Sequence, residues 1–419
     1  MSTKEYTFNE ETGECQVFTE LGIPEAVWEI AEKVKILDLQ DGKRNTLPED
    51  LPRFSNLVAI NCSKNAFSEI STILRDCSSL EIAIFNACHI QRVEENAFPE
   101  KIRAISLTNN RLNAIPSSIG QYQKLEKITL AGNQLEDLPL ELLDCGSLSM
   151  VRVAVNQLKS SPNWLFQHPK LAWFTDSANQ YSHSAESLLL DMPTVQWDSI
   201  ELGELIGESR KSKVYSAKMA DGKKIALKFF DSYLSTDGVI EDDIASSLLA
   251  GQHESVVGGI ARVVGAPDGK TGLVMPLVSS EYSSLGNLPT YTSLTRDVFD
   301  MKFSANVIDQ VIEDIANAMF HLSKLGIMHG DIYAHNILSN PQGKSMLGDF
   351  GCASLYTPKS HEGELRERID VLGFGYLIED LIQHASEQVS TDLVQLKERC
   401  LDSQVEGRPS FDEICKVLR

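Results

Sequence analysis

Apolar residues recur along the first half of the chain in a frame that repeats every 22 or 23 residues. In each repeat, three apolar residues come first, the second three positions after the first and the third two positions after the second. A polar or small residue follows three positions later, and a leucine often stands two positions beyond it. The polar or small position is occupied, in chain order, by Gly42, Asn65, Cys88, Asn110, Asn133, Asn156 and Asn179. Alternate residues of a strand face the same side. The pattern therefore predicts about seven short strands, each followed by a tight turn.

The repeated spelling L-x-x-L-x-L-x-x-N-x-L resembles the leucine-rich repeat family over about residues 34–182. One repeat cannot bury its own apolar face, whereas stacked copies can. The asparagine side chain is expected to bind backbone groups at the turn and so to form a ladder between repeats. We expect residues 31–182 to form a solenoid of about seven repeats, and residues 1–30 to cap its open end with Val27, Trp28 and Ile30.

The strand positions that should face away from the solenoid core are small and mostly uncharged. They are Ser106, Thr108, Asn109, Thr129, Ala131, Gly132, Arg152, Ala154, Val155, Thr175, Ser177 and Ala178. Such a surface allows another protein, or the second half of the same chain, to approach closely. We expect it to bind a protein substrate or regulator, with a solvated face that has no fixed partner as the alternative.

The repeat frame ends near Tyr181, and a different pattern begins at Ile200. Residues 183–199 are mixed in composition and are expected to be a linker. Beyond them, alternating apolar residues such as Ile225, Leu227 and Phe229 predict hairpin strands. A second domain is therefore predicted over residues 200–419.

Polar residues with metal-binding and base chemistry follow predicted strands in this second domain. Asp331 and Asn336 lie in the run H-G-D-I-Y-A-H-N, and Asp349 opens a D-F-G run thirteen residues after Asn336. The order and spacing resemble the protein kinase family. The resemblance implies that Asp331 accepts the proton of the attacking hydroxyl. It also implies that Asn336 and Asp349 hold Mg²⁺ against the phosphates of ATP.

A lysine within an apolar strand extends the resemblance. Lys228 follows Ala226 and Leu227, as in the V-A-I-K run of kinases, and a buried lysine is costly unless it is paired. The resemblance implies that Lys228 binds the ATP phosphates and pairs with an acid on the next helix, expected over residues 241–251. Asp243 is the nearest candidate for that acid, and a first-turn acid that favours the helix dipole is the alternative.

The remaining nucleotide-binding positions are weaker matches. A glycine-rich loop is implied at Gly207, Ser209, Ser212 and Val214, with only the first glycine of the family pattern retained. A hinge that binds adenine is implied at Met275, Leu277 and Val278. Two structural landmarks of protein kinases are also matched, an aspartate at Asp370 and a late arginine at Arg408.

Several positions depart from the kinase pattern. Gly330 replaces the arginine that reads activation-loop phosphorylation in kinases, and Tyr333 stands where Ser/Thr kinases usually have a lysine. The segment from Gly351 to Asp370 is short and contains no A-P-E run. These departures put the peptide-binding platform and the phosphorylation switch in doubt, and leave the metal and base residues in place.

Composition and charge limit the classes of partner. The 419 residues carry 38 Lys and Arg against 59 Asp and Glu, a net charge of −21, which disfavours nucleic acid and anionic membranes. No long apolar run predicts membrane insertion, and no secretory leader is evident. The eight cysteines form no C-x-x-C pair, so a reducing, cytoplasmic location is expected.

Together the two halves resemble bacterial-type leucine-rich repeat protein kinases with a divergent, eukaryotic-like Ser/Thr kinase domain. The expected fold is an N-terminal solenoid followed by a bilobal kinase-like domain, of α/β and α+β class. The expected function is ATP- and Mg²⁺-dependent phosphotransfer to Ser or Thr of a protein partner recruited by the repeats. A pseudokinase scaffold and a small-molecule phosphotransferase, which often has the H-G-D spelling, are the alternatives.

Overall fold

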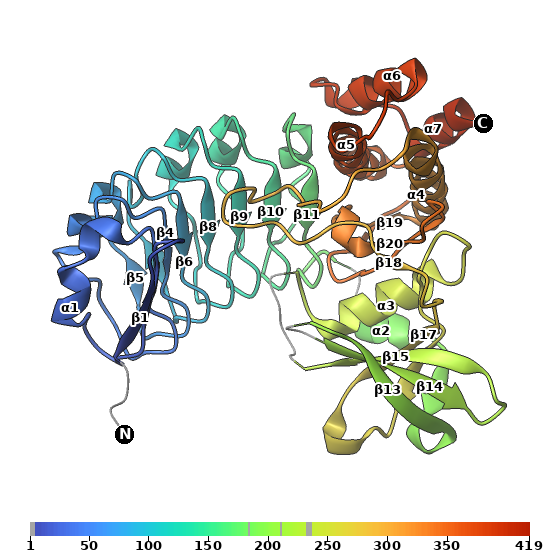
Figure 1. Ribbon diagram of the computed structural model, residues 1–419, viewed down its shortest axis with the longest axis horizontal. Helices are drawn as coiled ribbons and strands as arrows, with labels where there is room; N and C mark the ends of the chain where they lie inside the picture. The colour runs from blue at the N-terminus through green and yellow to red at the C-terminus, as the bar shows by residue number, and fades with distance from the viewer. Residues whose placement is uncertain (1–4, 183–184, 210–211, 232–236) are drawn as a thin grey trace. The chain divides into compact units, whose positions relative to one another are not determined.

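The computed structural model describes residues 5–182, 185–209, 212–231 and 237–419 (Figure 1). Two compact units are present. The first comprises Met1–Lys170 with Asn179–Tyr181, and the second comprises Leu171–Ala178 with Ser182–Arg419. The second unit therefore includes eight residues that belong, by sequence, to the last predicted repeat.

The first unit contains a sheet of short strands that lie side by side in chain order (Figure 1). The strands are β1 (Tyr6–Asn9), β2 (Glu14–Val17), β3 (Ile36–Asp38), β4 (Ala59–Asn61), β6 (Ile82–Ile84), β8 (Ala104–Ser106), β9 (Lys127–Thr129) and β10 (Met150–Arg152). β1 and β2 pair antiparallel, and every later pair is parallel. From β3 onward the strands follow the predicted spacing of 22 or 23 residues.

Short segments return the chain from each strand to the next. They are α1 (Glu25–Trp28), β5 (Glu69–Ile70), β7 (Arg92–Val93) and 3₁₀ turns at Ala31–Lys33, Leu51–Arg53, Thr72–Asp76, Ser117–Gln121, Leu140–Asp144 and Leu165–Gln167. Of the predicted cap residues, Val27 is fully buried, while Trp28 packs against Phe54 with ring centroids 4.9 Å apart. Residues 6–17 also add two strands to the end of the sheet, which the sequence did not predict.

Buried asparagines join neighbouring turns of the first unit. The amide nitrogen of Asn133 donates to the carbonyl oxygens of Leu107 and Leu130 at 2.9 and 2.8 Å. Its amide oxygen accepts from the backbone N–H of Leu112 at 3.0 Å. The same set of bonds recurs at Asn156, one turn further on. These bonds confirm the expected ladder and satisfy backbone groups that would otherwise be buried without partners.

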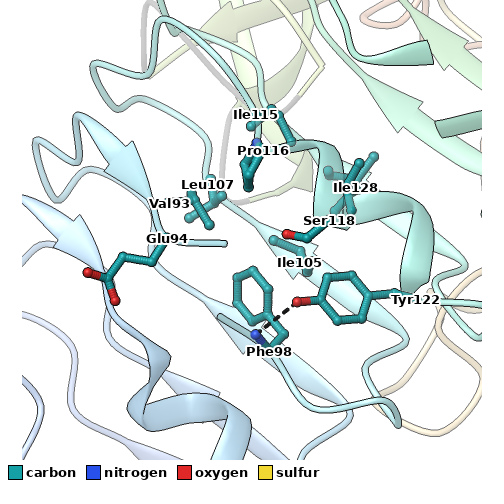
Figure 2. A pocket seen from close by; sticks show the side chains of 11 residues that line it. Val93, Glu94, Phe98, Ile105, Leu107, Ile115, Pro116, Ser118, Tyr122 and Ile128 are labelled. Carbon is teal, nitrogen blue, oxygen red and sulfur yellow. Dashed lines mark hydrogen bonds between the residues drawn. The ribbon is translucent and has the colours of Figure 1, made fainter. Parts of the chain in front are cut away.

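The interior of the first unit is closely packed. One hollow lies between the strands and the return segments, and its lining is almost wholly apolar (Figure 2). It is no larger than about one water molecule. Tyr122 points its hydroxyl across the hollow to the backbone N–H of Phe98, at 3.1 Å. The hollow is therefore a packing feature rather than a ligand site.

The second unit begins with β11 (Trp173–Thr175) and continues into a six-stranded sheet of order β12-β16-β17-β15-β14-β13. These strands are β12 (Thr194–Gln196), β13 (Ile200–Glu208), β14 (Ser212–Met219), β15 (Lys224–Phe230), β16 (Ala261–Val264) and β17 (Gly272–Pro276). Helices α2 (Ala185–Leu189) and α3 (Ile240–Ala250) share an apolar cluster with Phe230 and Leu273 of this sheet. The predicted linker thus contains α2 and β12, and β12 extends the sheet beside β16.

Four helices dominate the rest of the second unit. They are α4 (Ala305–Leu325), α5 (His361–Gln383), α6 (Thr391–Cys400) and α7 (Phe411–Leu418). Short strands β18 (Ser283–Ser284), β19 (Ile327–Met328), β20 (Ile337–Ser339), β21 (Ser345–Leu347) and β22 (Ser354–Leu355) lie among them (Figure 1). One buried cluster, including Ile315, Ile337 and Phe374, joins the helices to these strands. Within the described ranges, no helix is both long and apolar enough to cross a bilayer.

Candidate active site

An ion pair joins the sheet of the second unit to helix α3. Lys228 lies in β15, and its ammonium is 2.9 Å from Oδ2 of Asp243. Both side chains are nearly buried, with 14% and 9% of their surfaces exposed. Burial lowers the pKa of Lys228, but the carboxylates of Asp243 and Asp349 outweigh that effect and raise it above its ordinary value. Lys228 is therefore a fixed positive charge, as the sequence predicts.

Asp349 lies on the other side of the same lysine. Its Oδ1 is 3.8 Å from the Lys228 ammonium, and its side chain is 58% exposed. The backbone of Asp349 has a φ of 59°, a conformation that non-glycine residues adopt at a cost of about 1 kcal/mol or more. This turn aims the carboxylate at the lysine and leaves part of it open to solvent.

Asp331 and Asn336 face each other across one turn of the loop between β19 and β20. The amide nitrogen of Asn336 donates to the backbone carbonyl of Asp331 at 3.0 Å and to its Oδ2 at 3.1 Å. The amide nitrogen makes both bonds, so neither of them uses the amide oxygen, the atom with which an asparagine binds a cation. An amide oxygen and the Asp349 carboxylate are suitable donors for Mg²⁺, which binds few protein ligands and completes its shell with phosphate and water. The residues therefore fit the metal that the kinase resemblance implies.

A buried carboxylate of helix α5 holds the start of this loop. Asp370 accepts from the backbone N–H groups of His329 and Gly330, at 2.8 and 2.9 Å. Burial raises the pKa of Asp370 to about 7, against the lowering effect of the two N–H groups. The imidazole of His329 lies 3.1 Å from the carbonyl of Gly348, just before Asp349. The loop and the D-F-G run are thus fixed to each other through His329.

The phosphate-loop positions form the tip of the β13–β14 hairpin. The backbone N–H of Ser212 bonds to the hydroxyl of Ser209 at 3.1 Å, and the two hydroxyls are 3.2 Å apart. Gly207 pairs with Val214, and Val214 in turn pairs with Lys228 of the next strand. The hairpin is therefore joined in register to the strand that carries the lysine. Arg210 and Lys211 lie outside the described residues.

The predicted hinge positions lie at the end of β17. Met275 pairs with Ala226 of β15 and packs against the cluster shared by α2 and α3. Leu277 is 36% exposed and Val278 is half-buried. Helix α3 begins one residue before the predicted start and places Asp243 in its first turn. Contact of these three hinge residues with adenine stays a prediction.

The segment after the D-F-G run is very short. Only the nine residues 352–360 separate Gly351 from helix α5, which carries Asp370. β22 pairs with β19 within this segment. Helix α5 then begins directly, capped by the hydroxyl of Ser360. Within residues 352–360, β22 is the single strand or helix that the structure describes.

A buried ion pair near the site was not predicted from the sequence. Arg366 of α5 donates from both terminal nitrogens to Asp176, at 3.0 and 2.6 Å, and both side chains are 2% exposed. Arg366 also donates to the hydroxyl of Ser354 in β22, at 3.1 Å. One signal was available, because Asp176 occupies a frame position that is Leu107, Leu130 and Val153 in earlier repeats.

A family model matches the part of the chain that contains the residues of this candidate site. The family model described as protein kinase domain matches residues 200–371, which include Lys228, Asp331, Asn336 and Asp349. The chain contains a protein kinase domain. Asp331 and Asn336 lie in the loop between β19 and β20 of this domain, and Lys228 lies on β15.

Curated proteins of Arabidopsis thaliana are similar to part of this chain, and several of them are named as kinases. Protein STRUBBELIG-RECEPTOR FAMILY 5 of Arabidopsis thaliana is 30% identical over 200 residues, 43% of this chain and 27% of that protein. A G-type lectin S-receptor-like serine/threonine-protein kinase is 25% identical over 211 residues, 48% and 25% of the two chains. Cyclin-dependent kinase C-2 C, also from Arabidopsis thaliana, is 25% identical over 230 residues, 52% and 33%. The chain thus spans between a quarter and a third of these relatives.

Proposed function

We propose that this protein transfers the γ-phosphoryl group of ATP to Ser or Thr hydroxyls of a protein partner. The observation that carries the proposal is the pairing of Lys228 with Asp243 at 2.9 Å, with Asp349 3.8 Å from the same ammonium. Lys228 and Asp349, which are far apart along the chain, thereby lie close together. Kinases use a lysine and an aspartate in this arrangement to bind phosphate and metal. The serine/threonine-protein kinase named among the relatives supports the class of acceptor.

In the proposed reaction, Asp331 orients the acceptor hydroxyl and accepts its proton. The hydroxyl oxygen forms a bond to the γ-phosphorus while the bond from that phosphorus to the β–γ bridging oxygen breaks, and ADP leaves. Lys228 holds phosphate oxygens through its ammonium. Asn336 and Asp349 would hold Mg²⁺, which would supply positive charge at the transferring phosphate. The bond from Asn336 to the carboxylate of Asp331 keeps the base facing the metal-binding side of the loop.

We propose that the first unit is a leucine-rich repeat solenoid that recruits the partner. The regular spacing of β3 to β10 and the asparagine ladder support this assignment. Since the kinase domain has only residues 352–360 before α5, a partner gains little binding from that segment. Recruitment by the repeats would supply the missing affinity by raising the local concentration of the acceptor. The cytoplasm is the proposed location, since the eight cysteines are free thiols with buried side chains.

Incubation of the purified chain with labelled ATP, Mg²⁺ and generic protein acceptors tests the proposal. We expect label on protein from the unaltered chain and from Asp309→Ala, an exposed acid of α4. Asp331→Ala and Asp349→Ala are expected to lose at least about 100-fold in rate. Equal labelling by all four proteins would show that the activity comes from a contaminant.

The short segment before α5 favours a second candidate, a pseudokinase that binds ATP and signals by its shape. Absence of protein label, together with ATP binding detected by thermal shift, would support the pseudokinase and contradict the kinase proposal. The H-G-D spelling keeps a small-molecule phosphotransferase as a third candidate. Label that appears only on an added aminoglycoside or amino alcohol would support that one.

A further inference from the structure

Strand β11 lies directly against the catalytic loop, although its residues continue the repeat frame of the first unit. Trp173 of β11 is 1% exposed, and its indole N–H donates to the carbonyl of Ile332 at 3.3 Å. Ile332 is the residue after the proposed base, Asp331. The tryptophan therefore binds the loop at Ile332, just after the His329 and Gly330 N–H groups that Asp370 binds.

The same tryptophan is the centre of a stack of aromatic rings. Its ring is parallel to that of Tyr333, with centroids 4.7 Å apart and an interplanar angle of 8°. On its other face lies Tyr376 of α5, at 5.4 Å and 20°. Tyr333 in turn stacks on His335 at 4.9 Å. Tyr333 and His335 lie in the loop between Asp331 and Asn336. The stack on Trp173, a residue of the last repeat, thus fixes both of them.

Close backbone contact at Gly330 belongs to the same interface. Gly330 has a φ of 70°, and a Cβ there would lie 2.3 Å from the carbonyl oxygen of Phe174 and 2.9 Å from that of Cys352. No side chain fits in that space without backbone movement. Gly330 is the position at which kinases carry an arginine, so β11 occupies the volume that such a side chain would need.

We propose that Trp173 is a positioning residue for phosphotransfer, and that β11 is a built-in brace that holds the catalytic loop in its working shape. The brace acts on Ile332 through a hydrogen bond and on Tyr333 through stacking. A loop held before and after Asp331 along the chain keeps this residue in place without a phosphorylated activation segment. This inference rests on the proposed kinase activity for its catalytic part, and on geometry alone for its effect on the loop.

Hydrogen–deuterium exchange of the full-length chain tests the brace without any need for activity. In Trp173→Ala, the amides of residues 331–336 are expected to exchange at least about tenfold faster than in the unaltered chain. Trp164→Ala, the same substitution in the first unit, is the matched control and is expected to leave them unchanged. Unchanged exchange in Trp173→Ala would overturn the proposal. If that variant does not fold, Trp173→Leu keeps an apolar side chain in the space and replaces it.

Steady-state kinetics separate positioning from simple loss of stability. Trp173→Ala is expected to lower kcat about 100-fold, because misplacement of a base by about 1 Å has an effect of that size. The dissociation constant for ATP should change by no more than about twofold, since Lys228 and Asp349 keep their places. Trp173→Phe, which retains the stack and loses the N–H, should recover most of the rate.

The outcomes distinguish this inference from the proposed function. A lower melting temperature with kcat unchanged per folded site would give Trp173 a structural role only and overturn the inference. Faster loop exchange in Trp173→Ala, with no phosphotransfer by the unaltered chain, would support the brace and remove the kinase proposal instead.

Discussion

At the scale of single residues, the site depends on charges that are kept away from water. Lys228 is the centre of this set, because its ammonium contacts both Asp243 and Asp349. A buried charge is tolerated when it is paired, and its loss leaves the partner unpaired. Substitutions here are therefore expected to affect both stability and phosphate binding.

Lys228→Ala is expected to lower kcat/KM for ATP at least about 100-fold, because one cation at the phosphates is lost. Lys224→Ala, an exposed lysine at the start of the same strand, is the control and should remain near the unaltered value. Phosphotransfer assays at several ATP concentrations give the comparison. If both variants keep the rate of the unaltered chain, Lys228 does not bind phosphate.

Asp242, the neighbour of the paired acid in α3, gives a prediction about pH. Burial raises the pKa of Asp242 to about 6, from an ordinary value near 3.8. Between these values the unfolded chain loses the proton and the folded chain keeps it, so stability falls as pH rises through this range. Above pH 6 the loss in free energy of unfolding levels off at about 3 kcal/mol.

Asp242→Asn replaces the buried carboxyl by a neutral amide and so removes this loss of unfolding free energy. Urea unfolding is expected to show a gain of up to about 3 kcal/mol for this variant at pH 7.5 and little gain at pH 4. Asp392→Asn, an exposed acid in the first turn of α6, is the matched control. A gain that does not change between the two pH values would contradict the assigned ionisation of Asp242.

At the scale of elements, β11, α5 and β22 are joined by one buried guanidinium. Arg366 of α5 binds Asp176, just after β11, and Ser354 of β22. β22 follows the D-F-G run, so this arginine joins the end of the repeat frame to the segment that follows Asp349. Removal of either partner weakens the compensation of a buried charge.

Asp176→Ala is expected to destabilise the chain by about 3 kcal/mol or more, as measured by urea unfolding. Glu362 remains bonded to the arginine at 2.9 Å and limits the loss. The double variant Asp176→Leu with Arg366→Met should be much closer to the unaltered chain, because no charge is then buried alone. Additive effects of the two single substitutions would contradict the pairing.

The sequence predicted elements whose pattern is local and missed contacts that join distant segments. The repeat frame predicted the strands from β3 onward, since each depends on apolar spacing within one turn. The pairing of Lys228 with Asp243 was reached through the kinase resemblance, which fixes their order along the chain. By contrast, Trp173 and Tyr333 are separated by 160 residues, and no local pattern relates them. The single visible sign was the charged Asp176 at an apolar frame position.

At the scale of the whole molecule, the boundary of the second unit lies inside the last repeat. Since Leu171–Ala178 belongs to the second unit, a fragment that begins at residue 183 lacks the brace on the catalytic loop. A fragment of residues 171–419 retains it. The sequence frame alone would have placed the boundary after residue 182.

Residues 171–419 are therefore expected to give a cooperative thermal transition at a higher temperature than residues 183–419. The physical reason is the loss of Trp173 and of the partner of Arg366 in the shorter fragment. Calorimetry of the two fragments beside the full chain gives the comparison. Equal transition temperatures would mean that β11 adds nothing to the second unit.

The same longer fragment also separates catalysis from recruitment. It should phosphorylate a generic acceptor at a rate within about threefold of the full chain, since the site residues are all present. Phosphorylation of a partner that binds the repeats should fall much further, because the effective concentration is lost. An equal fall for both acceptors would argue against recruitment by the first unit.

The place of β11 has a consequence for how such a protein can change over evolutionary time. Turns between β3 and β10 are near copies, so gain or loss of a 23-residue unit there leaves the chemistry of the catalytic loop intact. The last turn is not interchangeable in this way, because Trp173 and Asp176 are matched to Tyr376 and Arg366. We expect homologues to differ in the number of upstream turns while these four positions change together or not at all.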